Sequence, residues 1–283
     1  MGSEINLRSG TEEGGRGMKN KKKHEVIPGY VPNHTMSFGK GNSWKKRTLI
    51  AVATEGWVSY LWAIRRFGQI VPVNWEASGY DVQYTAMGFS IDDAYNLITK
   101  QALDLKVDWL VIIEDDVILP PNCFLKFLEW QKKGTCPVVS GIYYTKASPA
   151  DPLVFRKRGN GAFTDWKPGD KVWCDGLPMG CLLIHTSLLR WMWDNAAPEY
   201  KATDGTVLHK VFETPQRIFI DPETGGIGTQ SGTQDLFFFD QILKHKVLEK
   251  TGWKRVAKRE YPFMCDTSIY CKHQCRMTGK MYP

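Results

Sequence analysis

Three consecutive carboxylates, Glu114-Asp115-Asp116, directly follow the apolar run at 109–113. Neighbouring carboxylates repel one another unless a cation or hydrogen-bond donors lie among them. Oxygen ligands at the end of a buried strand suit Mg²⁺ or Mn²⁺ carrying a diphosphate. The competing interpretation is a solvated acidic turn, and the triplet alone favours neither.

A second candidate is His273, which follows a predicted strand at 263–270. Taken alone, a histidine in this position is usually a surface residue. Cys265, Cys271 and Cys275 flank it and raise the alternative of a structural zinc site. Ligands at alternate positions along the chain are not a common zinc spacing, so zinc is the weaker interpretation.

A third candidate, Asp235, follows a Gly-rich loop at 221–233 and lies at the start of an apolar helix predicted at 234–248. The structural interpretation is that Thr233 or Asp235 caps the helix and complements its dipole. The functional interpretation is a general base on a lid that closes over substrate. Both roles can coexist in one residue.

The elements that must position these residues alternate along the chain. Apolar runs predict strands at 48–53, 70–75, 109–113, 138–144, 182–184 and 263–270, and helical spacing predicts helices at 57–67, 91–105, 120–130 and 187–193. This alternation indicates an α/β fold with a doubly wound, mostly parallel sheet. Ligands of such sheets bind at the carboxyl ends of the strands, where the acidic triplet lies.

The charge of the chain is concentrated at its start. The net charge is +7 over 283 residues, and residues 1–47 contain ten Lys or Arg and four Glu, a net of +6. We expect 1–46 to be a flexible basic tail and 47–283 to form a single domain. No nucleic-acid partner is expected; weak contact of the tail with a membrane surface is the minority interpretation.

The sequence shows no candidate membrane span and no signal peptide, so we expect a cytoplasmic protein. The seven cysteines are scattered and odd in number. Four of them, Cys123, Cys136, Cys174 and Cys181, lie in apolar stretches, where a buried free thiol is the expected state.

Taken in order, several motifs resemble those of the GT-A fold glycosyltransferases, especially the family 2-like group. The matching segments are the loop at Thr54 and Glu55, Ala94-Tyr95-Asn96, Glu114-Asp115-Asp116, the segment 172–184 with Gly176 and Gly180, Gln234-Asp235, and Asp266 to His273. Three departures stand out: Glu114 replaces the first acid of Asp-x-Asp, Tyr95 an Arg, and Gln234 a Glu.

The resemblance implies a Rossmann-like GT-A fold with a smaller acceptor-side subregion. It implies that Asp116 and His273 bind Mn²⁺ or Mg²⁺, and that Glu114 or Asp115 lies near the ribose or the metal, with Glu114 as a further metal candidate. It assigns donor contacts to Thr54, Glu55, Asn96 and Gly180, and the general base to Asp235.

The expected activity is metal-dependent transfer of a sugar, with inversion, from a UDP- or GDP-type donor to a hydroxyl of a glycan, protein or lipid acceptor. A nucleotidyltransferase would share the sheet and the carboxylates, but it usually has a basic Gly-rich loop that Thr54-Glu55-Gly56-Trp57 lacks. A metal-dependent hydrolase would need more His and Asp at strand ends, and a carbohydrate-binding module would not explain the acids.

Overall fold

A computed structural model describes residues 47–72, 75, 83–157, 161–202, 204–220 and 227–283. Its centre is a seven-stranded sheet with the strand order β2-β1-β3-β7-β5-β12-β6. These strands are β1 (Thr48–Thr54), β2 (Gln83–Met87), β3 (Trp109–Glu114), β5 (Val138–Ile142), β6 (Lys171–Cys174), β7 (Cys181–His185) and β12 (Phe263–Tyr270).

Most of the strands in this sheet run in the same direction. β1 pairs in parallel with β2 and β3, and β5 pairs in parallel with β12. β7 runs antiparallel to β3 and β5, and β6 runs antiparallel to β12. The predicted Rossmann-like α/β class with a mostly parallel sheet is confirmed. The reversed direction of β6 and β7 was not predicted.

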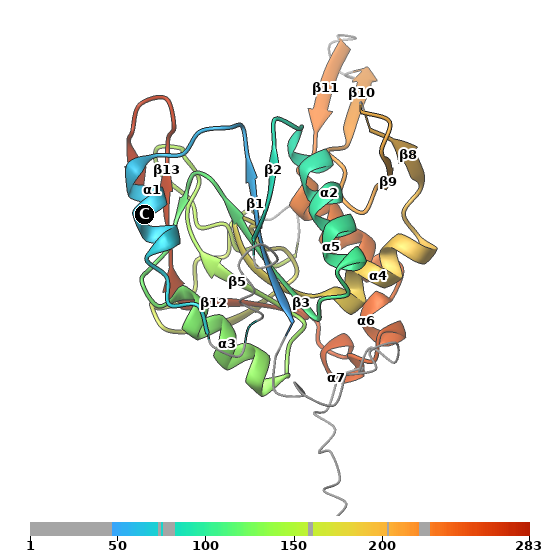
Figure 1. The fold of residues 1–283 in the computed structure, drawn as a ribbon, viewed down its shortest axis with the longest axis horizontal. Helices are drawn as coiled ribbons and strands as arrows, with labels where there is room; N and C mark the ends of the chain where they lie inside the picture. Colours follow the sequence, from blue (N-terminus) through green and yellow to red (C-terminus); the bar gives the residue numbers. More distant parts are fainter. Residues whose placement is uncertain (1–46, 73–74, 76–82, 158–160, 203, 221–226) are drawn as a thin grey trace, which may run out of the picture.

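Helices cover both faces of the sheet (Figure 1). In this view α2, α4, α5 and α6 lie on one side, and α1 and α3 lie on the other. The helices are α1 (Tyr60–Phe67), α2 (Ile91–Asp104), α3 (Cys123–Lys133), α4 (Thr186–Asn195), α5 (Gln234–Lys244), α6 (Val247–Lys250) and α7 (Lys254–Ala257). None of the helices in the described part of the chain has the length and apolar character needed to cross a membrane.

Three small sheets complete the fold. β4 (Val117–Ile118) pairs with β13 (Lys272–Gln274), which pairs with β14 (Met281–Tyr282). β8 (Glu199–Lys201) pairs with β9 (Val207–His209), and β10 (Gln216–Ile220) pairs with β11 (Ile227–Ser231). The sheet β4-β13-β14 brings the C-terminal segment back to the residues that follow β3.

Four local predictions need correction. No strand forms at 70–72, where Pro72 interrupts the run and Ile70 is exposed; the second strand is β2. Helix α1 begins at Tyr60 because Ser59 caps it, and the helix predicted at 234–248 breaks at Lys246 into α5 and α6. The predicted loop contains strand β11 at 227–231; its remainder at 221–226, like the tail 1–46, lies outside the described residues.

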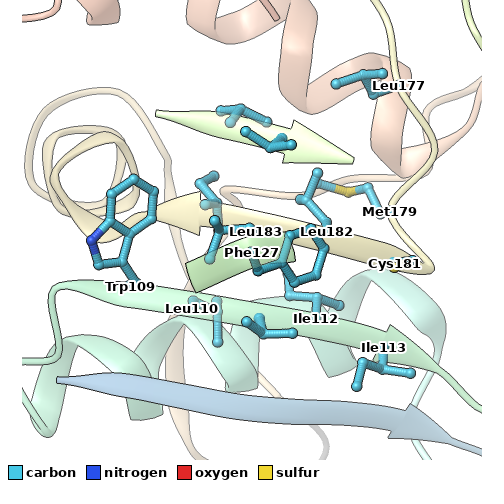
Figure 2. Close-up of a cluster of buried hydrophobic side chains, with 14 of the residues drawn as sticks. Trp109, Leu110, Ile112, Ile113, Phe127, Leu177, Met179, Cys181, Leu182 and Leu183 are labelled. Atoms are coloured by element: carbon cyan, nitrogen blue, oxygen red, sulfur yellow. The ribbon is translucent and has the colours of Figure 1, made fainter. Parts of the chain in front are cut away.

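The core holds the carboxyl end of β3 in place. Every residue of β3 from Trp109 to Ile113 is buried, and Figure 2 shows the side chains of β3 and β7 packed around Phe127 of α3. Burying each such large apolar side chain contributes about 1.5–3 kcal/mol. The buried thiols Cys123, Cys136, Cys174 and Cys181 are free, as predicted. The acidic triplet therefore begins where a rigid buried strand ends.

Candidate active site

A cavity of about 250 Å³ opens at the carboxyl ends of β1 and β3. Residues from both strand ends, from the start of α2 and from the C-terminal segment line it: Ala53, Thr54, Glu55, Phe89, Ile91, Ala94, Glu114, Asp116 and Arg276. Four of the predicted site residues, Thr54, Glu55, Glu114 and Asp116, thus share one cavity. This is the edge of the sheet at which the doubly wound topology predicts a ligand.

Asp116 is a cavity carboxylate whose negative charge is stabilised by neighbouring cationic side chains. Its Oδ2 accepts a hydrogen bond from Lys146 Nζ at 2.5 Å and lies 3.6 Å from His273 Nε2. Burial alone would raise the pKa of Asp116, but His273 and Lys146 lower it to about 2. The other oxygen, Oδ1, is buried and has no hydrogen-bond partner among the described residues. Asp116 therefore keeps one anionic oxygen available to a ligand.

The imidazole of His273 is oriented by the backbone. Nδ1 lies 2.7 Å from the carbonyl oxygen of Tyr144, which can only accept a hydrogen bond, so Nδ1 carries the proton. β13 pairs with β4, with His273 opposite Val117, and this register brings Nε2 to Asp116. A histidine that binds a metal usually donates its other ring N–H in this way. The orientation leaves Nε2 available as a ligand atom.

Asp115 joins the end of β3 to the loop after β1. Its Oδ2 accepts a hydrogen bond from the backbone N–H of Glu55 at 3.2 Å, and its Oδ1 is bonded to the Arg276 guanidinium. Burial raises the pKa of Asp115, against the opposing effects of Thr54 and Arg276. Asp115 does not line the cavity. Its position supports Glu55 and Arg276, which do.

Glu114 is enclosed by two phenols and a glycine. The hydroxyl of Tyr95 donates to Oε1 at 2.6 Å, and that of Tyr143 approaches Oε2 at 3.4 Å. A Cβ at Gly180 would lie 2.5 Å from Oε2, so this site requires glycine at 180. Burial and the charge of Asp116 raise the pKa of Glu114 to about 7. Gly180 and Tyr95 therefore position Glu114, and neither lines the cavity itself.

The raised pKa of Glu114 predicts a pH-dependent stability. Between its ordinary pKa of 4.5 and about 7, the folded state retains a proton that the unfolded state releases. The free energy of unfolding should therefore decrease by on the order of 1–3 kcal/mol as the pH rises through this window. In Glu114→Gln this decrease should be absent. Urea titrations at several pH values measure it.

The matched control is Glu129→Gln, which removes an exposed carboxylate on α3. Its pH dependence should follow that of the wild type. Parallel stability curves for Glu114→Gln and the wild type would show that Glu114 is already ionised at low pH.

Asn96 occupies a different environment from the one predicted. Its amide nitrogen donates to the carbonyl of Phe212 at 2.9 Å, and its amide oxygen accepts from the N–H of Phe212 at 2.9 Å. The side chain is buried and does not line the cavity. Asn96 therefore holds the loop before β10 against α2, and the structure does not bring it to the other predicted donor-binding residues.

Asp235 lies half-buried in the first turn of α5. Its Oδ1 accepts a hydrogen bond from the N–H of Leu236 at 2.7 Å within that turn. The N-cap residue is Thr233, whose side chain makes no capping hydrogen bond. Burial raises the pKa of Asp235, and its charge in turn helps to raise the pKa of Glu114 and of Tyr143. Asp235 does not line the cavity.

Three residues of this region were missed by the sequence-based predictions. Lys146 and Arg276 provide the positive charges that face the acids. The hydroxyl of Tyr143 donates to Glu114 and accepts a hydrogen bond from the N–H of Gly180. Arg276 lies three residues after His273, so the nearness in sequence was an available signal. Lys146 and Tyr143 follow β5, and only the fold brings them to Asp116 and Glu114.

The protein ligands fit a divalent cation that arrives with a diphosphate. No three His, Cys, Asp or Glu side chains within the described ranges come close enough to hold a metal alone. Mg²⁺ commonly takes one or two protein ligands, with phosphate oxygens and waters supplying the rest. The free Oδ1 of Asp116 matches that requirement, and Nε2 of His273 lies 3.6 Å from the other oxygen of the same carboxylate. The alternative zinc site with Cys265, Cys271 and Cys275 does not form.

The chain is distantly similar to solved structures of known proteins. No protein-family model and no curated protein matches the sequence. The solved structure of A197 from STIV is 15% identical, covers 83% of this chain and 93% of its own, and has a TM-score of 0.49. A putative glucose-1-phosphate thymidylyltransferase from Bacillus anthracis, in complex with a sucrose, is 12% identical, covers 41% of this chain and 46% of its own, and has a TM-score of 0.27. Both scores are too low to argue from, so the Rossmann-like α/β assignment rests on the sheet itself.

Proposed function

We propose that this protein is a glycosyltransferase that moves a sugar from a nucleoside-diphosphate donor to an acceptor hydroxyl. One observation carries the proposal: Asp116 with a free oxygen and Arg276 line one cavity at the strand ends. His273, with its oriented imidazole, does not line the cavity but lies 3.6 Å from Asp116. This combination suits a diphosphate with its cation better than it suits a neutral ligand.

Asp116 and His273 would hold Mn²⁺ or Mg²⁺, which supplies electrostatic stabilisation of the negative charge that grows on a leaving diphosphate. Arg276 adds a second positive charge, and its Nε is buried without a hydrogen-bond partner among the described residues. Glu55 directly follows β1, is exposed and is paired with Arg276 at 2.8 Å, and it would contact the nucleoside of such a donor. Thr54 lines the same wall.

The reaction needs a base for the acceptor hydroxyl. In the proposed step the Asp235 carboxylate takes the hydroxyl proton while the acceptor oxygen forms a bond to the anomeric carbon. The bond from that carbon to the β-phosphate oxygen breaks, and its electron pair leaves with the nucleoside diphosphate. Burial raises the pKa of Asp235, which makes it a stronger base than an exposed aspartate. Attack opposite the leaving group inverts the anomeric carbon.

The test is calorimetry of UDP and GDP with Mn²⁺ and with EDTA, followed by a hydrolysis screen over a panel of nucleotide sugars. We expect Mn²⁺-dependent binding of one diphosphate and slow hydrolysis of one matching sugar donor. Formation of a nucleotide sugar from a nucleoside triphosphate and a sugar phosphate would instead identify a nucleotidyltransferase. Binding of neither nucleotide would overturn the proposal.

Arg276→Met should weaken nucleoside-diphosphate binding about tenfold, since a lost charge-assisted contact costs on the order of 1.5 kcal/mol or more. The variant also removes the ion pairs of Arg276 with Asp115 and Glu55, which can lower the stability of the fold. Thermal melting should therefore be recorded alongside the calorimetry. Arg259→Met is the matched control, because Arg259 is an exposed arginine that lies over the ring of Trp173. Equal affinities of the two variants would remove Arg276 from the binding site.

A further inference from the structure

Helix α1 leaves most of its large apolar side chains exposed. The residues that face the protein are Trp62 and Arg66, which are 3% and 4% exposed. Trp62 Nε1 donates to the carbonyl of Glu114 at 2.8 Å, and the guanidinium of Arg66 lies 5.2 Å from the ring centre of Phe124. A surface helix normally turns its apolar stripe inward. Here the helix is anchored through these two residues.

The outward face of the same segment is apolar. We call it the α1 surface; it consists of Trp57, Tyr60, Leu61, Ile64, Phe67 and Ile70. Tyr60 is 83% exposed, Phe67 65% and Ile70 61%. Single exposed apolar residues are ordinary, but a contiguous apolar face usually marks an interaction site. The α1 surface is therefore a candidate interaction site.

The charges around the α1 surface are mostly positive, and the exposed Glu55 beside it is paired with Arg276. No Asp or Glu occurs at 56–75, where Arg65 is exposed, or at 267–283, where Lys272 and Lys280 are exposed. These two segments lie side by side, as Figure 1 shows for α1 and β13. Ser59, the cap of α1, donates a hydrogen bond to Gln274 of β13 at 2.5 Å. The result is an apolar face bordered by cations.

The loop between β13 and β14 adds a second apolar contact. Met277 at its tip is 95% exposed, and it follows Arg276, which is bonded to Glu55 two residues before Trp57. Because Glu55 and Arg276 line the cavity, the α1 surface and the Met277 loop both begin at the cavity wall. Whatever binds this surface lies next to the opening of the candidate site.

We propose that the α1 surface and the Met277 loop bind the surface of an anionic lipid bilayer. Exposed Trp, Tyr, Phe and Leu side chains bordered by Lys and Arg are the combination that inserts at a headgroup boundary. Each cation near an anionic bilayer adds attraction that salt weakens. The absence of acids from both segments matches a uniformly negative partner. The proposal does not depend on glycosyl transfer.

The test is flotation of the full chain with vesicles of phosphatidylcholine alone and of phosphatidylcholine mixed with phosphatidylserine. We expect binding to the mixed vesicles that decreases with added salt. The variant Tyr60→Ser/Phe67→Ser/Ile70→Ser should bind them at least about tenfold more weakly, since it loses three inserting side chains. All three side chains are exposed, so thermal melting should be unchanged.

The matched control is Val207→Ser/Leu243→Ser/Ile220→Ser, which removes three exposed apolar side chains from β9, α5 and β10. These elements lie on the other side of the molecule from α1 in Figure 1. This variant should bind vesicles as the wild type does. A second variant, Lys272→Gln/Lys280→Gln, should lose the preference for phosphatidylserine and keep its melting temperature.

Three results would overturn the proposal. The wild type does not float with either vesicle; the Tyr60, Phe67 and Ile70 variant floats as well as the wild type; or binding is lost only in Lys21→Gln/Lys22→Gln/Lys23→Gln, which would assign it to the basic N-terminal segment. Light scattering tests whether the α1 surface instead binds a second copy of the chain. In that case the wild type would be a dimer that does not bind vesicles, and Tyr60→Ser/Phe67→Ser/Ile70→Ser would be a monomer.

Discussion

Turnover of Asp235→Asn should fall by roughly 10²–10⁴-fold, the range typical of general-base loss. The amide retains the size of the carboxylate and can still accept the hydrogen bond from the N–H of Leu236, so the first turn of α5 should persist. Affinity for the donor nucleotide should change little, because the proposed base contacts the acceptor. The measurement pairs turnover with calorimetric affinity for the nucleoside diphosphate.

The pH profile gives this prediction a second, independent readout. Burial raises the pKa of Asp235, so the wild type should lose activity on acidification at a pH above the ordinary aspartate range. The acid limb should vanish in Asp235→Asn. Asp240→Asn, an exposed aspartate on the same helix, is the matched control and should keep both turnover and profile. Normal turnover in Asp235→Asn would leave Asp235 with only a structural role in the first turn of α5.

Mn²⁺-dependent nucleotide affinity should fall by at least about 100-fold in Asp116→Asn, since loss of a direct ligand should cost at least as much as loss of the groups that orient one. Because the pKa of Asp116 is about 2, its carboxylate is ionised at every working pH, and the amide removes that charge. Lys146, His273 and Arg276 then lose their shared anion. Binding measured in EDTA should therefore stay the same or increase.

The contrast between Mn²⁺ and EDTA separates loss of the metal from loss of the fold. Asp104→Asn, which removes a carboxylate from an exposed i,i+4 pair with Lys100, should behave as the wild type. If Asp116→Asn remains folded and its nucleotide affinity still rises with Mn²⁺ as in the wild type, the cation is held elsewhere. The proposed role of His273 as a metal ligand would then be wrong as well.

Local patterns determined most of the elements and the position of the acids. The run at 109–113 is uniformly apolar, and this composition predicts a strand buried on both faces; it forms β3 and ends at Glu114 as expected. Ser90 caps α2 by accepting from the N–H of Asp93, which the sequence also predicted. These features depend on residues within one turn or one strand of each other, so they can be predicted from the sequence.

The tertiary structure decided which of the predicted residues meet. Asp116, Lys146 and His273 are separated by 30 to 157 positions, and only the pairing of β13 with β4 and the path after β5 bring their charges together. Asn96 faces Phe212 instead of the cavity because its neighbours on α2 pack against the loop before β10.

The direction of each strand was also decided by the tertiary structure. β7 is as apolar as β3, yet it runs antiparallel to β3. The pattern of apolar residues in a strand indicates whether one or both of its faces are buried. The direction of the strand and its contacts depend instead on where the connecting chain returns to the sheet.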